Sequence, residues 1–299
     1  MTAFSFLCIV SLWAVSVASA AEPKTSLPLW PGRAPGEELA DKAEADTTKP
    51  TDNLVAGRRV IRLGHVSSPA LSFYPAAQAR PEAPTVVVFP GGGYHILAMD
   101  LEGTEVCDWL NGIGMHAVLV KYRVPRPPSG PPHRKALQDA QRAMGMVRNH
   151  ARAWGIRADR VGVLGFSAGG HLAAALTASA LQTRAYAAVD EADTLSCLPD
   201  FQLLIYPGYL FEKEKPGAVA TEVEPHAKTP KTFLVMTQDD GVRVENVLVY
   251  YHALLREKIP SELHIYPSGG HGYGLRKTEV PVTTWADRAA DWLRHQIAP

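Results

Sequence analysis

The chain has 299 residues, 46% of them hydrophobic, which is enough apolar material for the core of one large domain or two small ones. Its 30 Lys and Arg residues equal its 30 Asp and Glu residues in number, so the sequence lacks the basic excess typical of nucleic-acid-binding proteins. Beyond the N-terminal segment, no apolar stretch is long enough to span a bilayer. We therefore expect no nucleic-acid partner and no stable membrane association of the mature chain. The sequence leaves the oligomeric state open.

Residues 1–20 have the form of a signal peptide. Their apolar stretch is followed by Ala18-Ser19-Ala20, a small-x-small pattern typical of signal-peptide cleavage. No Lys or Arg precedes the apolar stretch, so the α-amino group supplies the only positive charge there. We predict cleavage after Ala20 or Ala21 and a secreted or periplasmic protein. A membrane anchor or a buried helix is the alternative for this segment.

Strand and helix patterns alternate along the rest of the chain. Residues 21–55, rich in Pro, Glu, Asp and Thr, predict an extended lead-in before a folded domain over residues 56–299. The run TVVVF at 85–89 is apolar and β-branched, as a buried central strand is. The longest helical pattern covers 134–154, where apolar residues recur every three or four positions. The other predictions are a strand pair at Val60–Leu63 and Ala70–Tyr74, helices at Thr104–Asn111, Ala168–Ala180, Val244–Leu255 and Thr284–Ile297, and strands at Met115–Tyr122, Arg160–Leu164, Phe201–Tyr206, Thr232–Met236 and Leu263–Tyr266.

This alternation indicates parallel βαβ units, and hence an α/β fold with a mostly parallel sheet. Two irregular insertions, residues 123–133 and 207–230, each follow a predicted strand. They should lie near the carboxyl edge of the sheet, where ligands bind in folds of this class. We therefore expect a functional site at this edge.

A serine flanked by glycines stands between a predicted strand and a predicted helix. Residues 165–169, GFSAG, have the pattern G-x-S-x-G of the nucleophile elbow, in which serine occupies a sharp strand-to-helix turn. Side chains at Gly165 and Gly169 would collide there with neighbouring backbone. We predict that Ser167 is a nucleophile. The alternative is a glycine-rich helix start with an N-capping serine.

A nucleophilic serine needs a base and a group that orients the base. In enzymes with this elbow, the acid and then the histidine follow the serine along the chain. Here MTQDDGV at 236–242 and GGHGYG at 269–274 each follow a late strand, which predicts His271 as the base and Asp240 as the acid. Asp239 is the alternative acid, although its carboxylate could instead bind loop amides. We expect His171, one helical turn after the serine, to have a packing or supporting role.

The glycine-rich segment FPGGGYH at 89–95 directly follows the predicted central strand. A loop in this position supplies a backbone N–H to the oxyanion of acyl transfer, together with the N–H of the residue after the nucleophile. We predict Gly92 and Gly93, with Gly92 favoured, and Ala168 as these donors. Tyr94 and His95 are predicted to meet the substrate. The alternative is a plain glycine turn.

Acyl transfer through a serine needs no metal or cofactor, and we expect neither. The acidic residues Asp100 and Glu102 lie near the glycine-rich loop, and we expect Glu102 to cap a helix that starts near Gly103. Cys107 and Cys197 could pair in an exported protein, although buried free thiols fit the sequence as well.

Together, several segments resemble the acetylxylan-esterase-like branch of the α/β-hydrolases, over about residues 27–292. The resemblance implies an α/β-hydrolase fold without a large cap domain, and removal of acetyl groups from xylan or related plant polysaccharides. It departs from the hormone-sensitive-lipase relatives at Pro90, where those enzymes often have histidine. A feruloyl esterase, a general short-chain carboxylesterase and a catalytically silent binding module of the same fold are the alternatives. The segments that carry the resemblance are PGGGY (90–94), GFSAGGHLAA (165–174), DDGVRVENVLVYYHAL (239–254) and GGHGYGL (269–275).

Overall fold

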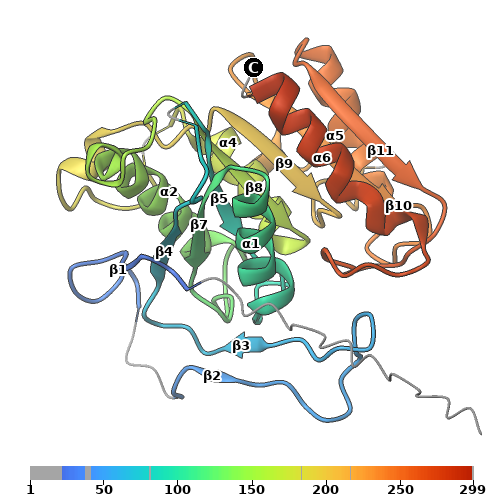
Figure 1. Ribbon diagram of the computed structural model, residues 1–299, viewed down its shortest axis with the longest axis horizontal. Coiled ribbons are helices and arrows are strands. Elements are labelled where there is room, and N and C mark those ends of the chain that lie inside the picture. The colour runs from blue at the N-terminus through green and yellow to red at the C-terminus, as the bar shows by residue number, and fades with distance from the viewer. Residues whose placement is uncertain (1–21, 38–41, 81, 183, 216, 298–299) are drawn as a thin grey trace, which may run out of the picture.

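A sheet of eight strands runs through the part of the chain that the computed structural model describes, residues 22–37, 42–80, 82–182, 184–215 and 217–297 (Figure 1). The predicted signal peptide, residues 1–20, lies outside these ranges. Strand β4 is antiparallel to both β1 and β7, and from β7 onward all neighbours are parallel. In spatial order the strands are β1 (Thr25–Pro28), β4 (Ala70–Tyr74), β7 (His116–Lys121), β5 (Thr85–Phe89), β8 (Val161–Phe166), β9 (Phe201–Ile205), β10 (Lys231–Thr237) and β11 (Ser261–Tyr266).

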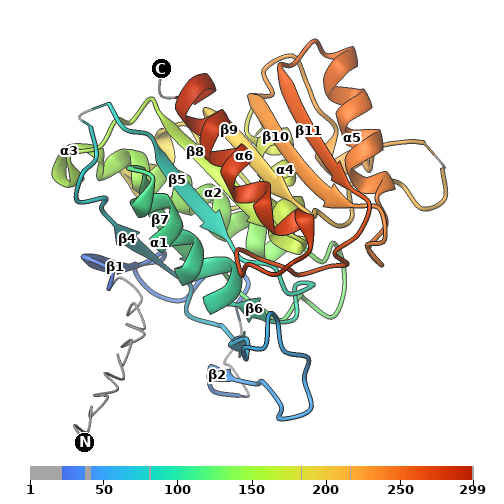
Figure 2. The same ribbon diagram turned by 45° about the vertical axis from the view of Figure 1, so that its right-hand side comes forward.

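The two central strands, β5 and β8, are buried along their whole length, because helices cover both faces of the sheet. Trp109 of α1 and Trp285 of α6 meet on one face, with ring centroids 5.7 Å apart. Figure 2 shows α1 and α6 on this face and α2 and α4 on the other. This arrangement confirms the predicted mostly parallel sheet flanked by helices. The main helices are α1 (Glu105–Gly112), α2 (Arg134–Asn149), α4 (Ala168–Ser179), α5 (Glu245–Arg256) and α6 (Trp285–Trp292).

The predicted strand pair in the N-terminal part is wrong. Strand β3 (Arg62–Gly64) pairs with β2 (Ala45–Asp46) and β6 (Leu97–Ala98) in a small separate sheet. It cannot pair with β4, because β1 and β7 occupy both edges of that strand. The lead-in therefore contributes β1 to the main sheet and β2 to the small one.

Two further expectations are refined by the structure. The helical pattern at 134–154 divides into α2 and a single turn, α3 (Ala151–Trp154). His150 separates them with φ −86° and ψ 0°, and its Nδ1 lies 2.9 Å from the Met146 carbonyl oxygen. Cys107 and Cys197 are both buried free thiols, so the two cysteines do not pair.

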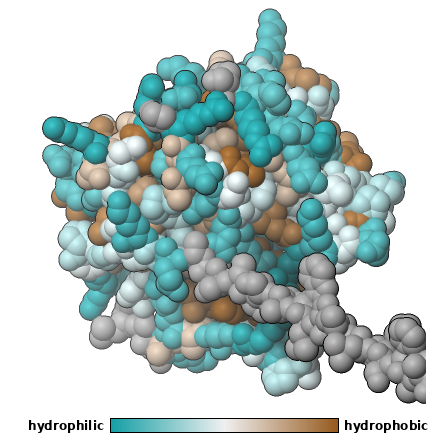
Figure 3. Space-filling view, viewed as in Figure 1, coloured by the Kyte–Doolittle hydropathy of each residue, from teal (hydrophilic) through white to brown (hydrophobic). Residues whose placement is uncertain are grey.

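The surface of the described residues is mainly hydrophilic on the face drawn in Figure 3, with hydrophobic residues in small separate groups. Large exposed hydrophobic side chains are likewise distributed over distant segments, for example Leu54, Leu181 and Leu255. Among the described helices, none has the length and apolar character needed to cross a membrane.

A buried ion pair joins the lead-in to the domain. The guanidinium of Arg123 donates from Nε to Asp139 at 2.9 Å, and these side chains are 1% and 0% exposed. The indole N–H of Trp30 donates to the other oxygen of this carboxylate at 2.9 Å. Arg123 also donates to the Pro35 carbonyl oxygen at 2.7 Å. The carboxylate of Asp139 therefore holds both a lead-in side chain and the start of the 123–133 insertion.

Replacing this carboxylate should destabilise the protein. In Asp139→Ala, the buried guanidinium of Arg123 keeps, among the described carboxylates, only the more distant one of Glu37, at 3.5 Å, and the loss of one member of a buried pair costs about 3–5 kcal/mol. We expect a fall of that size in the free energy of unfolding, measured by urea denaturation. The control is Asp159→Ala, which removes an exposed pair with Arg157 and should leave the midpoint nearly unchanged. Equal midpoints for the two variants would contradict the prediction.

Candidate active site

A one-residue turn places Ser167 between the end of β8 at Phe166 and the start of α4 at Ala168. Its φ of 51° and ψ of −117° is a strained conformation for a residue with a side chain. A Cβ at Gly165 would lie 2.1 Å from the Gly169 carbonyl oxygen, and a Cβ at Gly169 would lie 2.1 Å from the Phe89 carbonyl oxygen. The turn thus requires glycine at both positions, as the sequence predicted.

Hydrogen bonds connect the predicted serine, histidine and acid in a chain. The His271 Nε2 lies 2.8 Å from the Ser167 Oγ, and its Nδ1 lies 2.7 Å from the Asp240 Oδ2. The Asp240 side chain is fully buried, and its other oxygen accepts from the Val242 N–H at 2.7 Å. These three side chains follow β8, β10 and β11, so the predicted edge of the sheet brings them together. With Asp240 ionised, Nδ1 donates and Nε2 is free to accept the serine proton.

The neighbouring carboxylate has a different partner. Asp239 is exposed and accepts from the N–H groups of Gly270 at 2.9 Å and Gly269 at 3.2 Å. These bonds, that of Gly270 above all, lower the pKa of Asp239 below its usual range. The structure therefore places Asp240 at the imidazole, while Asp239 holds the loop that carries His271.

The glycine-rich loop lies directly against the elbow. A Cβ at Gly91 would lie 2.8 Å from the Cβ of Ser167, so only glycine fits there. Gly92 and Gly93 follow with φ of 134° and 63°, and neither N–H donates a hydrogen bond to any described residue. The N–H of Ala168 belongs to the first turn of α4, where helical amides have no partner inside the helix. The role of these three N–H groups as oxyanion donors stays a prediction.

The expectation that Glu102 caps a helix is wrong. The residue lies within the π-helical turn Asp100–Thr104 and is buried. Its carboxyl group accepts hydrogen bonds from the Gly91 N–H at 2.6 Å and from the Tyr206 hydroxyl at 2.9 Å. Burial raises the pKa of Glu102. The Tyr206 hydroxyl in turn accepts from the Gly274 N–H at 3.2 Å. Glu102 and Tyr206 therefore connect the glycine-rich loop to the segment after His271.

Sequence reasoning missed this connection, and the only available signal was an acidic residue close to the glycine-rich loop. The Tyr206 ring also lies beside the imidazole of His271, with ring centroids 5.0 Å apart. It is 104 residues from Glu102 in the chain, so no spacing pattern relates the two.

The two residues expected to meet substrate occupy different environments. Tyr94 is only 1% exposed, and its hydroxyl lies 2.8 Å from the Nδ1 of His171, so it supports a neighbouring ring. His95 is exposed, and its contact with substrate stays a prediction. Tyr209, which the sequence analysis did not single out, is 42% exposed and stacks on Tyr94. Burial leaves little of Tyr94 accessible to a substrate, whereas the neighbouring Tyr209 ring is accessible.

Comparison with known proteins assigns the family. A family model described as "alpha/beta hydrolase fold" matches residues 86–227. The structure is also similar to that of an acetyl ester-xyloside bifunctional hydrolase from Caldicellulosiruptor lactoaceticus. The two chains are 33% identical, superpose with a TM-score of 0.68, and the match covers 90% of this chain and 95% of the other. This chain belongs to the α/β-hydrolase family.

Two curated relatives resemble this chain over a smaller share of their own length. The acetylxylan esterase of Xylanibacter ruminicola is 31% identical over 245 residues, which cover 73% of this chain and 47% of the relative. The endo-1,4-beta-xylanase B of Butyrivibrio fibrisolvens is 27% identical over 212 residues, which cover 65% of this chain and 33% of the relative. The chain thus spans about half the length of the first relative and a third of the second.

Among the described residues, one group of side chains could hold a metal ion. It consists of His133, His171 and Glu222. His171 stands one turn along α4 from the serine, and its N–H donates to the Ser167 carbonyl oxygen at 3.1 Å. The group therefore lies next to the elbow without sharing a side chain with the Ser167–His271–Asp240 chain.

Removing the Glu102 carboxyl group should displace the glycine-rich loop. In Glu102→Ala, the Gly91 N–H and the Tyr206 hydroxyl lose their buried acceptor, at a cost of about 1–3 kcal/mol for each unsatisfied group. We expect kcat on p-nitrophenyl acetate to fall by up to about 100-fold, the lower end of the effect of losing one oxyanion donor. Glu102→Gln keeps one acceptor oxygen and should retain more activity. An unchanged kcat in a folded Glu102→Ala protein would contradict the positioning role.

Proposed function

We propose that the protein is a serine esterase that removes acyl groups, acetyl above all, from xylan or related plant polysaccharides through an acyl-enzyme. The observation that carries this proposal is the hydrogen-bond chain from the Ser167 hydroxyl through His271 to the buried carboxylate of Asp240. This arrangement is the one that activates a serine for attack on a carbonyl carbon.

The proposed reaction has two acyl-transfer steps. His271 takes the proton of Ser167 as the Oγ attacks the ester carbonyl, and the N–H groups of Ala168 and of Gly92 or Gly93 stabilise the oxyanion. The tetrahedral intermediate collapses, and the imidazolium gives its proton to the leaving sugar hydroxyl. Water, deprotonated by the same imidazole, then attacks the acyl-enzyme and releases the carboxylic acid and free serine.

Asp240 has an electrostatic and orienting role in this scheme. Its ionised carboxylate accepts from Nδ1, which keeps the proton off Nε2 in the resting state. It also stabilises the positive charge that the imidazole acquires in each step. Because the side chain is fully buried, water screens this interaction little.

Three observations support a polysaccharide ester as substrate. The His271 side chain is 30% exposed and its Nε2 lies 2.8 Å from the Ser167 Oγ, so a polymer can approach the serine from solvent. Two relatives carry the names acetylxylan esterase and acetyl ester-xyloside bifunctional hydrolase. The predicted signal peptide at residues 1–20 would export the enzyme to where such polymers occur. A feruloyl esterase and a general short-chain carboxylesterase are the competing activities.

Substitutions in the hydrogen-bond chain test the enzyme class. We expect Ser167→Ala to lower kcat on p-nitrophenyl acetate by at least about 10⁴-fold, and Asp240→Asn by about 10⁴-fold through loss of the correct imidazole tautomer. Asp239→Asn is the matched control at the adjacent carboxylate, and it should cost far less. Equal rates of p-nitrophenyl acetate hydrolysis by wild type and Ser167→Ala would contradict the esterase proposal and favour a catalytically silent binding module.

A comparison of substrates tests the polysaccharide proposal separately. We expect the wild-type enzyme to release acetate from acetylated xylan with a higher kcat/KM than it shows for p-nitrophenyl butyrate, since the sugar chain adds binding energy around the serine. The Ser167→Ala protein controls for spontaneous deacetylation. A clear preference for the butyrate ester would instead indicate a general carboxylesterase.

A further inference from the structure

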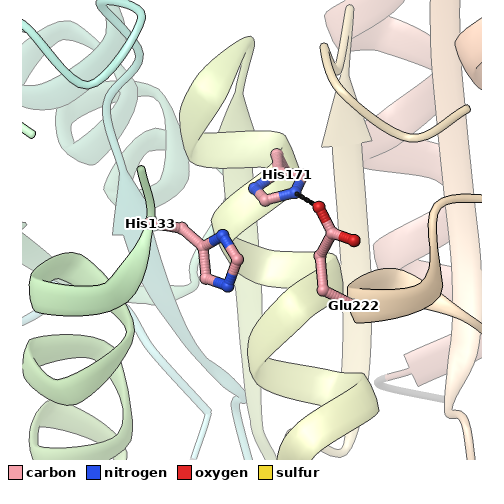
Figure 4. A group of neighbouring side chains, drawn as sticks. All are labelled: His133, His171 and Glu222. Carbon is pink, nitrogen blue, oxygen red and sulfur yellow. Dashed lines mark ion pairs between the residues drawn. The ribbon is translucent and has the colours of Figure 1, made fainter. Parts of the chain in front are cut away.

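Three side chains from separate parts of the chain converge beside α4, as Figure 4 shows. His133 precedes α2, His171 lies in the first turns of α4, and Glu222 belongs to the short helix Thr221–Val223. Each offers one ligand atom, and these atoms all lie within 4.8 Å of one another. Among them, His171 Nε2 and Glu222 Oε1 lie 3.5 Å apart.

Two of these atoms are buried without a hydrogen-bond partner. His133 and His171 are 8% and 1% exposed, and neither His133 Nδ1 nor His171 Nε2 has such a partner among the described residues. Buried polar atoms in proteins normally have one, so each exception calls for a physical explanation. Figure 4 shows the His133 ring and the Glu222 carboxylate beside the His171 ring, with an ion pair drawn between His171 and Glu222. A shared ligand is the explanation that accounts for both.

The surroundings prepare these side chains to bind a cation. The two histidine side chains are almost fully buried, whereas the Glu222 side chain is 42% exposed. Neutral imidazole and ionised carboxylate are the forms that bind metals. The Tyr94 hydroxyl holds Nδ1 of His171 at 2.8 Å and leaves Nε2 toward the group, as supporting residues do at metal sites.

We propose that His133, His171 and Glu222 bind one divalent cation of the zinc type, with water as the fourth ligand. Two imidazoles and one carboxylate suit Zn²⁺, and tetrahedral coordination at about 2.0–2.1 Å separates ligand atoms by about 3.3 Å. The 3.5 Å between His171 and Glu222 already matches this spacing. Glu222 has a 42% exposed side chain, so it can adjust to close the remaining distance.

The cation would join the two insertions that border the serine. His133 ends the 123–133 insertion, and Glu222 lies within the 207–230 insertion, which also carries Tyr209. His171 attaches both to the helix that begins at the nucleophile. The ion takes no part in acyl transfer in this proposal, which therefore goes beyond the proposed esterase activity. Its role is to hold the insertions in place around the substrate.

Metal titration of the full chain tests the proposal without any activity assay. After treatment with a chelator and its removal, ZnCl₂ is titrated by isothermal calorimetry, and CoCl₂ by the visible absorption of tetrahedral Co²⁺. We expect one ion per chain, and a rise in Tm of about 5 °C at free zinc 100 times Kd. Glu222→Gln and His133→Gln should each raise Kd more than about tenfold, the lower limit for loss of even a supporting residue.

Two controls separate this site from other histidines. Glu262, like Glu222, has a 42% exposed side chain and lies 2.7 Å from a histidine, His264, so Glu262→Gln is the matched variant and should leave Kd unchanged. His271→Gln should also leave one ion per chain, which excludes binding at the serine–histidine pair. The proposal is overturned if zinc does not bind saturably, if folded Glu222→Gln and His133→Gln proteins keep the wild-type Kd, or if His271→Gln abolishes binding. Saturable binding that only those two variants weaken would support it, whatever the esterase assays show.

Discussion

The strained turn at Ser167 is the constraint on which the rest of the site depends. A single residue with positive φ joins β8 to α4, and such a conformation persists only where the surrounding packing maintains it. That packing needs Gly165 and Gly169, where any Cβ would overlap backbone atoms of the elbow or of β5. As a result the hydroxyl stands at the carboxyl edge of the sheet, within 2.8 Å of His271.

Around this turn, carboxylates hold the loops by accepting from backbone N–H groups. Glu102 fixes the glycine-rich loop at Gly91, and Asp239 fixes the loop that carries His271 at Gly269 and Gly270. Glycine-rich loops bury few apolar side chains, so hydrogen bonds to acidic side chains largely determine where they lie. One of these carboxylates is buried and the other is exposed, yet both stabilise backbone that the proposed reaction would use.

Much of this protein could be predicted from local sequence patterns. The apolar runs of β5 and β8 and the G-x-S-x-G turn are properties of a few adjacent residues. Each of Ser167, Asp240 and His271 follows a strand in the sequence. Because parallel strands present their carboxyl ends at one edge of the sheet, this position alone predicts that the three residues meet there. Elements that depend on distant partners were less predictable, and β3 was assigned to the wrong sheet because a strand pattern does not identify its neighbour.

By itself, then, the sequence determined the fold class, the elbow and the pair of adjacent acids available to the histidine. Only the tertiary structure decided between Asp239 and Asp240, because consecutive side chains point in different directions and only one can face the imidazole. It also decided that Glu102 binds Gly91 and Tyr206, and it brought together the three side chains beside α4: His133, His171 and Glu222. These contacts join segments far apart in the chain, and no periodicity or spacing encodes them, since they arise only when the sheet and its loops pack.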